Sequence, residues 1–240
     1  MNIACKIAYN GEHFFGFQTQ KDANTVANKL TQALRSIGIF SSFVASGRTD
    51  KGVHASAQVI SLKIPSFHKD LQNLKSRLNA KLYPFIKIKA IWEVSADFHA
   101  RFSAKKRSYC YVIAQKQSPF LNPFSLFYPI KNEKLLKDSI KIFLGKHNFS
   151  AFMKKGGSGE RNGSVREIYK IKLIKRGNFY LFYIQANGFL RAQIRLMIAF
   201  LLEIDKGNLS IKDLEAQLNG KEIFKIPALP CGLFLSGVHY

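Results

Sequence analysis

The chain has 240 residues, of which 47% are hydrophobic, so it has the length and composition for one large or two ordinary globular domains. Its 37 Lys and Arg against 15 Asp and Glu give a net charge of +22, which predicts a polyanionic partner: RNA or DNA first, and an anionic membrane surface second. Three scattered cysteines and no run of about 18 apolar residues argue against a disulfide framework and a membrane span, and we expect a cytoplasmic protein.

The first hundred residues show the pattern of strand, helix, strand, strand, helix and strand. In the first helix the apolar side chains fall on one face, Asn24 or Thr25 can cap the start, and Gly38 ends it. The expected elements are strands at residues 3–9, 43–45, 59–64 and 86–94 and helices at residues 25–37 and 71–78.

The same order of elements recurs in the rest of the chain. Residues 176–178 give a hairpin signal, residues 156–159 form a glycine-rich loop with basic neighbours, and Ser210 with Asp213 predicts a capping box that opens a short extra helix. The expected elements are strands at residues 108–113, 169–175, 179–186 and 232–238 and helices at residues 135–144 and 190–201.

This order predicts an α+β fold of two tandem split β-α-β halves, each like a ferredoxin or RNA-recognition domain. The predicted domains are residues 1–103 and 104–240. Each half would place its helices on one face of an antiparallel sheet. The other face would stay free, and folds of this shape often read single-stranded RNA there. Tyr109 and Tyr111 share one face of a predicted strand, where they fit RNA stacking or simple core packing.

A stretch between two predicted strands, Gly47–Ala55, brings glycines, an arginine and an aspartate together. Gly47 and Gly52 let the backbone turn sharply on either side. In an extended segment, residues two apart face the same way, so Arg48 and Asp50 would point into the same space. A guanidinium beside a carboxylate keeps it ionised, ready to act as nucleophile or base. A salt-bridged structural turn is the alternative reading of these residues.

The stretch Gly47–Ala55 closely resembles the signature loop of the tRNA pseudouridine synthase A family. Further blocks that match the family in the same order are Tyr9–Gln20, Thr25–Val26 with Ala33–Leu34, Phe98–Ala104 with Arg107 and Tyr109, Ala186–Leu190 with Arg195, and Pro227–Ala228 with Gly232–Leu233. The match covers nearly the whole chain. The chain departs from the family where Phe17 replaces a usual tryptophan and where Arg191, Ala192 and Gln193 stand in place of the more frequent histidines and methionine.

The resemblance implies that the two sheets join into a pseudouridine synthase fold, with an active-site cleft on the face opposite the helices. It implies isomerisation of uridine to pseudouridine at positions 38, 39 and 40 in the anticodon stem-loop of tRNA, by a homodimer whose tRNA spans both subunits. The reaction needs no cofactor. No C-x-x-C or H-E-x-x-H spacing occurs, so no metal site is implied.

In this hypothesis Asp50 is the catalytic residue, and it attacks the sugar, attacks the base or removes a sugar proton. Arg48 and Arg195 keep its carboxylate charged and positioned, or Arg48 instead fills the space that the flipped base leaves. Tyr109 stacks on the extracted uracil or shuttles a proton, and Leu233 lines the apolar side of the pocket.

Three other functions fit parts of the same pattern. A non-catalytic tandem-domain RNA-binding protein would share the charge, the fold and the aromatic residues, and a pseudouridine synthase could act on a different RNA. A membrane-surface protein is the third, although no suitable amphipathic helix occurs. For His54 and His99 we expect structural hydrogen bonds and no role as a base.

Overall fold

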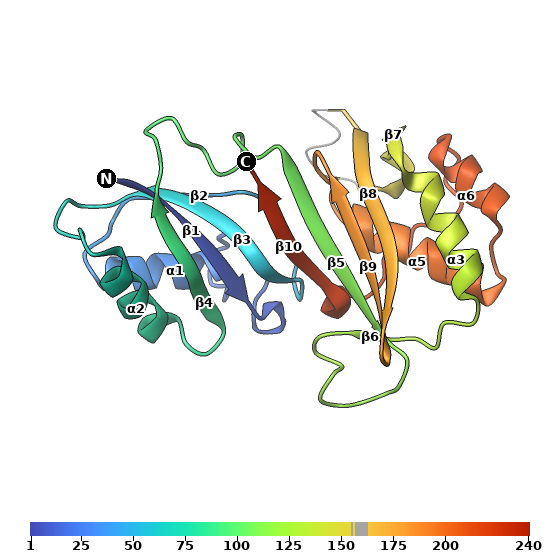
Figure 1. The fold of residues 1–240 in the computed structure, drawn as a ribbon, viewed down its shortest axis with the longest axis horizontal. Coiled ribbons are helices and arrows are strands. Elements are labelled where there is room, and N and C mark those ends of the chain that lie inside the picture. Colours follow the sequence, from blue (N-terminus) through green and yellow to red (C-terminus); the bar gives the residue numbers. More distant parts are fainter. Residues whose placement is uncertain (155, 157–162) are drawn as a thin grey trace. The chain divides into compact units, whose positions relative to one another are not determined.

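The first part of the chain is built on a sheet with the strand order β4-β1-β3-β10 (Figure 1). Its elements are β1 (Asn2–Tyr9), η1 (Gly11–His13), α1 (Val26–Arg35), β2 (Phe43–Ala45), β3 (His54–Lys63), α2 (Leu71–Leu82), β4 (Ile86–Glu93) and β10 (Leu233–His239). Strand β1 pairs antiparallel with β3 and with β4, and β2 pairs antiparallel with β3. The predicted order of strands and helices over the first hundred residues is therefore confirmed.

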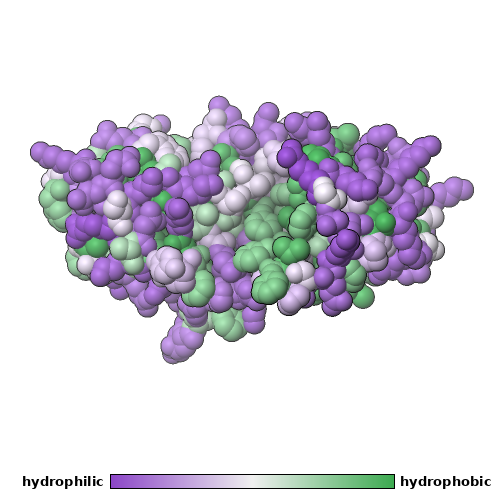
Figure 2. Space-filling view, turned by 60° about the horizontal axis from the view of Figure 1, so that its bottom comes forward, coloured by the Kyte–Doolittle hydropathy of each residue, from purple (hydrophilic) through white to green (hydrophobic). Residues whose placement is uncertain are grey.

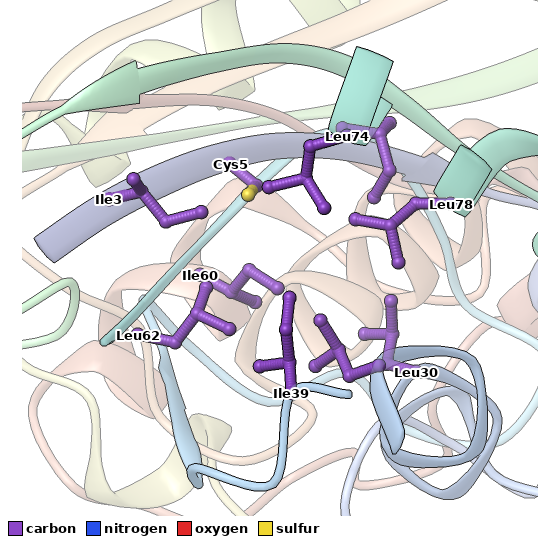
Figure 3. Close-up of a pocket in the computed structure, with 10 residues that line it drawn as sticks. Ile3, Cys5, Leu30, Ile39, Ile60, Leu62, Leu74 and Leu78 are labelled. Atoms are coloured by element: carbon purple, nitrogen blue, oxygen red, sulfur yellow. The ribbon is translucent and has the colours of Figure 1, made fainter. Parts of the chain in front are cut away.

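Helices α1 and α2 cover one face of this sheet because the apolar residues of both fall on one side. Thr25 is the cap of α1, and its hydroxyl accepts the Asn28 amide N–H at 3.1 Å. Figure 3 shows leucines of both helices pointing toward apolar side chains of β1 and β3. They leave a cavity of about 10 Å³, lined by Ile3, Cys5, Leu30, Leu34, Ile39, Ile60, Leu62, Leu74, Leu78 and Ile88. A space of that size with an apolar lining is a packing defect and not a ligand site.

In the second part of the chain, antiparallel strands follow in the order β5-β9-β8-β7, and β6 pairs in parallel with β5. Its elements are β5 (Lys106–Ala114), β6 (Leu126–Phe127), α3 (Glu133–Ser139), η2 (Ile140–Phe143), β7 (Gly145–Asn148), η3 (Ser150–Phe152), β8 (Val165–Arg176), β9 (Phe179–Ala186), α5 (Gln193–Lys206), α6 (Ile211–Leu218) and η4 (Pro230–Gly232). The predicted hairpin joins β8 to β9, where Arg176 pairs with Phe179. The predicted capping box of Ser210 and Asp213 opens α6.

The computed structural model describes residues 1–154, 156 and 163–240, and these form two compact units. The first unit holds Met1–Lys105 with Phe234–Tyr240, and the second holds Lys106–Leu233. That residues 1–103 and 104–240 each fold as a domain stays a prediction. Most of the glycine-rich loop predicted at residues 156–159 lies outside the described residues. The α+β class, with helices on one side of a sheet, is confirmed.

The last strand lies in the first unit, although the order of elements assigned it to the second half. Strand β10 pairs in parallel with β3, which aligns Phe234 with His54 and Leu235 with Ala55. The chain end is also held there, since the Lys105 amide donates to the His239 carbonyl at 2.8 Å. Partners so distant in sequence leave no local signal, so the order of elements alone does not predict this pairing.

Candidate active site

The loop between β2 and β3 carries Arg48 and Asp50, and its two ends are closed by the β2–β3 ladder. Ala45 pairs with Ile60, and the Ser46 amide donates to the Val59 carbonyl at 2.8 Å. The loop therefore starts from a fixed strand pair, as the sequence predicts for a loop mounted on a sheet.

The segment after β1 holds this loop from one side. The Phe17 amide donates to the Thr49 carbonyl at 3.0 Å, and the buried Tyr9 and Thr49 hydroxyls share a hydrogen bond of 2.8 Å. Gly16 has a positive φ of 92°, and a Cβ at this position would lie 2.9 Å from the Thr49 carbonyl oxygen. Only glycine allows this close approach without strain. The backbone beside Asp50 is thus fixed by two separate contacts.

Gln58 of β3 holds the loop from the other side. Its fully buried side chain donates from Nε2 to the Gly47 carbonyl at 2.8 Å. Its Oε1 accepts the Ser46 hydroxyl and the Val59 amide. Gln58 is not among the site residues predicted from the sequence, where its only signal is a polar residue within an apolar strand.

A tight turn follows the aspartate. The Val53 amide donates to the Asp50 carbonyl at 3.1 Å, and Gly52, at the third position of the turn, has a φ of 76°. A positive φ at that position is typical of a type II turn and favours glycine. This turn sets the direction in which the chain leaves Asp50.

Side-chain exposure alternates along the loop. Thr49 is buried, Arg48 is exposed and Asp50 is half-buried, which agrees with the prediction that Arg48 and Asp50 share one side of the backbone. Among the described residues, however, no hydrogen bond or ion pair joins Arg48 to Asp50. No direct contact in the described part of the chain therefore supports the predicted role of Arg48 in holding the Asp50 carboxylate.

His54 has the structural role that the sequence analysis favours. Its Nδ1 accepts the Gly11 amide N–H at 3.0 Å, which places the ring proton on Nε2, and its ring stacks on Phe234 with 4.6 Å between centroids. Gly11 packs so tightly that a Cβ there would fall 2.0 Å from the Val53 carbonyl oxygen. His99 likewise accepts the amide N–H groups of Arg101 and Phe102 on Nδ1.

Tyr109 lies in β5 of the second unit. Its ring meets Phe189 edge to face, with 5.2 Å between centroids, and its backbone pairs with Ile184 of β9. Tyr111, two residues on, is buried and donates its hydroxyl to the Leu229 carbonyl at 2.8 Å. Burial raises the pKa of Tyr111 above its usual value, so this hydroxyl stays protonated. Tyr111 is therefore part of the packed core of this unit, which is the second of the two roles expected for it from the sequence.

Arg195 of α5 is anchored to the segment that leads to Leu233. Its Nε donates to the Ala228 carbonyl at 2.7 Å, and the Ala228 amide donates back to the Arg195 carbonyl at 3.0 Å. Further along this segment Gly232 packs on Tyr111, where a Cβ would lie 2.9 Å from the ring. In the second unit, Arg195 and Tyr111 therefore both contact the segment that leads to Leu233.

The unusual residues before Arg195 form the start of α5. Ala192 has a positive φ of 60°, and the buried Gln193 accepts the Leu190 amide N–H on Oε1 at 2.8 Å. Gln193 also approaches the Met197 sulfur, with 3.8 Å between Nε2 and Sδ. The helix consequently begins at Gln193, three residues later than the predicted range.

Hydrophilic side chains cover most of the face drawn in Figure 2, in keeping with the excess of Lys and Arg. Within residues 1–154, 156 and 163–240, no group of three or more His, Cys, Asp or Glu side chains could hold a metal ion. No helix of the same residues has both the length and the apolar character to cross a membrane.

Comparisons with known proteins agree over almost the whole chain. The family described as tRNA pseudouridine synthase matches residues 5–103 and 140–240. The chain is 40% identical to tRNA pseudouridine synthase A of Helicobacter hepaticus, over 98% of this chain and 97% of that protein. It is 36% identical to the protein of that name from Wolinella succinogenes (98% and 92%) and 37% identical to that of Campylobacter jejuni (100% and 100%). The chain therefore belongs to the tRNA pseudouridine synthase family.

Proposed function

We propose that this protein converts uridine to pseudouridine at positions 38, 39 and 40 in the anticodon stem-loop of tRNA, with Asp50 as the catalytic residue. One observation carries the proposal: in a chain of this family, Asp50 stands on a loop that Phe17, Tyr9 and Gln58 hold from two sides. A loop fixed in this way can present a carboxylate to a reacting nucleotide with little reorganisation.

The reaction is an isomerisation, so its atoms balance within the nucleotide. The bond from N1 to C1′ breaks, the uracil turns, and C5 bonds to C1′. The proton on C5 then leaves, and N1 takes up a proton. No oxidant, reductant or cofactor is needed. A single carboxylate serves this sequence by attacking the sugar, attacking the base or removing a sugar proton.

Arg195 and Arg48 assist the aspartate in different ways. Arg195, anchored through Nε on the Ala228 carbonyl, would keep the Asp50 carboxylate ionised. The exposed Arg48 would enter the space that the target base leaves as it swings out of the stem. This second role fits the lack of a contact between Arg48 and Asp50.

Tyr109 and Leu233 would form the walls of the base pocket. The Tyr109 ring is held edge to face against Phe189 and would stack on the extracted uracil. Leu233 would line the apolar side, since it follows the segment that Arg195 and Tyr111 hold. Lys and Arg side chains would bind the phosphates around this pocket. We further propose that the active form is a cytoplasmic homodimer whose tRNA spans both subunits.

Release of tritium from tRNA labelled at C5 of its uridines tests the reaction, because pseudouridine formation removes that hydrogen. We expect release by the wild type from a transcript whose only labelled uridines are at positions 38–40. Asp50→Asn should bind the tRNA and release nothing. Asp138→Asn is the matched control, since it removes an exposed carboxylate of α3 that pairs with Lys141 at the surface.

The possible results separate the competing functions. Binding without release by the wild type would favour an RNA-binding protein without catalysis. Release from another RNA alone would move the substrate away from the anticodon stem-loop. Release by Asp50→Asn would remove Asp50 from the centre of the reaction.

A further inference from the structure

We propose that Lys51, held on the ring of Phe15, binds a backbone phosphate next to the target uridine. This inference rests on the proposed function, because it takes Asp50 to mark the place of the reacting nucleotide. It adds a phosphate contact made by the residue that directly follows the aspartate.

Phe15 is a fixed platform although half of its side chain is exposed. Its amide donates to the Asn24 carbonyl at 2.8 Å, and its own carbonyl accepts the Gln20 side-chain amide at 2.9 Å. The next residue, Gly16, packs against the backbone of Thr49 and Lys51. The ring is thus tied to the same stretch of loop that carries Asp50, and its exposed fraction of 51% leaves a face open.

Lys51 lies over this ring. Its Nζ is 4.1 Å from the Phe15 centroid, well within the distance at which an ammonium and an aromatic face attract each other. The lysine is the second residue of the turn from Asp50 to Val53, so its backbone is fixed as well. A lysine side chain normally loses much rotamer freedom when it binds a partner, and the ring restricts that freedom beforehand.

The charge of Lys51 has no carboxylate partner in the part of the chain that the structure describes. The Lys51 ammonium is exposed, has a fixed position and lies one residue from the proposed catalytic carboxylate. It can therefore bind an anion that lies beside the reacting nucleotide. In RNA that anion is the phosphodiester, which lysine binds as a point charge. A base stacking on Phe15 is the competing use of this surface.

The salt dependence of tRNA binding tests the proposal directly. Each phosphate contact contributes nearly one unit to the slope of log Kd against log salt concentration. We expect Lys51→Gln to lower that slope by about one unit and to weaken binding at 0.1 M salt by about tenfold. Lys63→Gln is the matched control: it removes the same charge from the far end of β3, nine residues or about 30 Å from His54, and it should keep the wild-type slope.

A double-mutant cycle tests the part played by Phe15. Phe15→Leu should weaken binding roughly twofold to fivefold, the strength of an exposed cation–π contact, while Phe15→Tyr should bind like the wild type. In the Lys51→Gln background, Phe15→Leu should cost nothing more, because the ring would act through the lysine. Circular dichroism and melting temperatures of all variants verify that they fold.

Two results would overturn the proposal. An unchanged slope in Lys51→Gln would mean that no phosphate is bound there, and an undiminished effect of Phe15→Leu in that background would mean that the ring contacts RNA by itself. Failure of the proposed function would look different. Asp50→Asn would then still release tritium, whatever the slopes of the Lys51 variants.

Discussion

The Phe17 amide and the Thr49 carbonyl oxygen form a hydrogen bond of 3.0 Å immediately before Asp50. This bond joins the segment after β1 to the loop between β2 and β3. The close packing of Gly16 makes the bond possible, because a side chain there would push the two backbones apart. The position of the aspartate therefore depends on a residue without a side chain.

Gly16→Ala should damage both stability and turnover. The positive φ costs about 1 kcal/mol for alanine, and the new Cβ at 2.9 Å from the Thr49 oxygen must displace the loop. We expect a loss of about 2–3 kcal/mol in the free energy of unfolding and a drop in turnover of roughly a hundredfold, since a displacement of about 1 Å has that effect. Urea unfolding and tritium release measure the two quantities.

Gly207→Ala separates the cost of the positive φ from the cost of the close contact with Thr49. Gly207 has a φ of 85°, close to that of Gly16, but nothing lies within 4 Å of the position of its Cβ. The variant should lose about 1 kcal/mol of stability and keep its activity. Equal losses of activity in both variants would show that the contact with Thr49 does not matter.

Arg195→Lys should reduce turnover even though the charge is kept. Lysine has no nitrogen at the position of Nε, so the 2.7 Å hydrogen bond to the Ala228 carbonyl is lost. We expect stability to fall by about 1 kcal/mol and turnover to fall by roughly a hundredfold. The exposed Arg176→Lys, at the end of β8, should change neither. Near wild-type turnover of Arg195→Lys would argue against anchoring through Ala228.

Alkaline pH should destabilise the fold through Cys5. Burial raises the pKa of this thiol from 9.0 to about 12, so the folded protein keeps a proton that the unfolded chain releases. The stabilisation is complete below pH 9 and is lost as the pH rises from 9 to 12. Between pH 7 and pH 10 the wild type should lose about 1 kcal/mol more than Cys5→Ala in urea unfolding. Parallel pH curves for the two proteins would contradict the role of this thiol.

Local features of the fold were predictable because each has a signal within a few residues. The cap at Thr25, the hairpin after Arg176 and the capping box of Ser210 and Asp213 all depend on side chains that bond to nearby backbone. The loop of Arg48 and Asp50 was also placed correctly between two strands.

The supports of that loop could not be read from the sequence. Gln58 reaches the Gly47 carbonyl only because β3 passes beside the loop, and Tyr9 meets Thr49 only after β1 and β3 pair. The parallel pairing of β10 with β3 could not be predicted for the same reason. Contacts between residues far apart in the chain are fixed by packing, which leaves no periodic pattern in either partner.

The central claim is that this protein makes pseudouridine in the anticodon stem-loop of tRNA and that Asp50 is essential to it. The most direct test is to map pseudouridine in tRNA from cells that lack the protein and carry either the wild type or Asp50→Asn on a plasmid. We predict that positions 38, 39 and 40 stay unmodified with Asp50→Asn and are modified with the wild type. Pseudouridine at these positions in cells without the protein, or its restoration by Asp50→Asn, would contradict the claim.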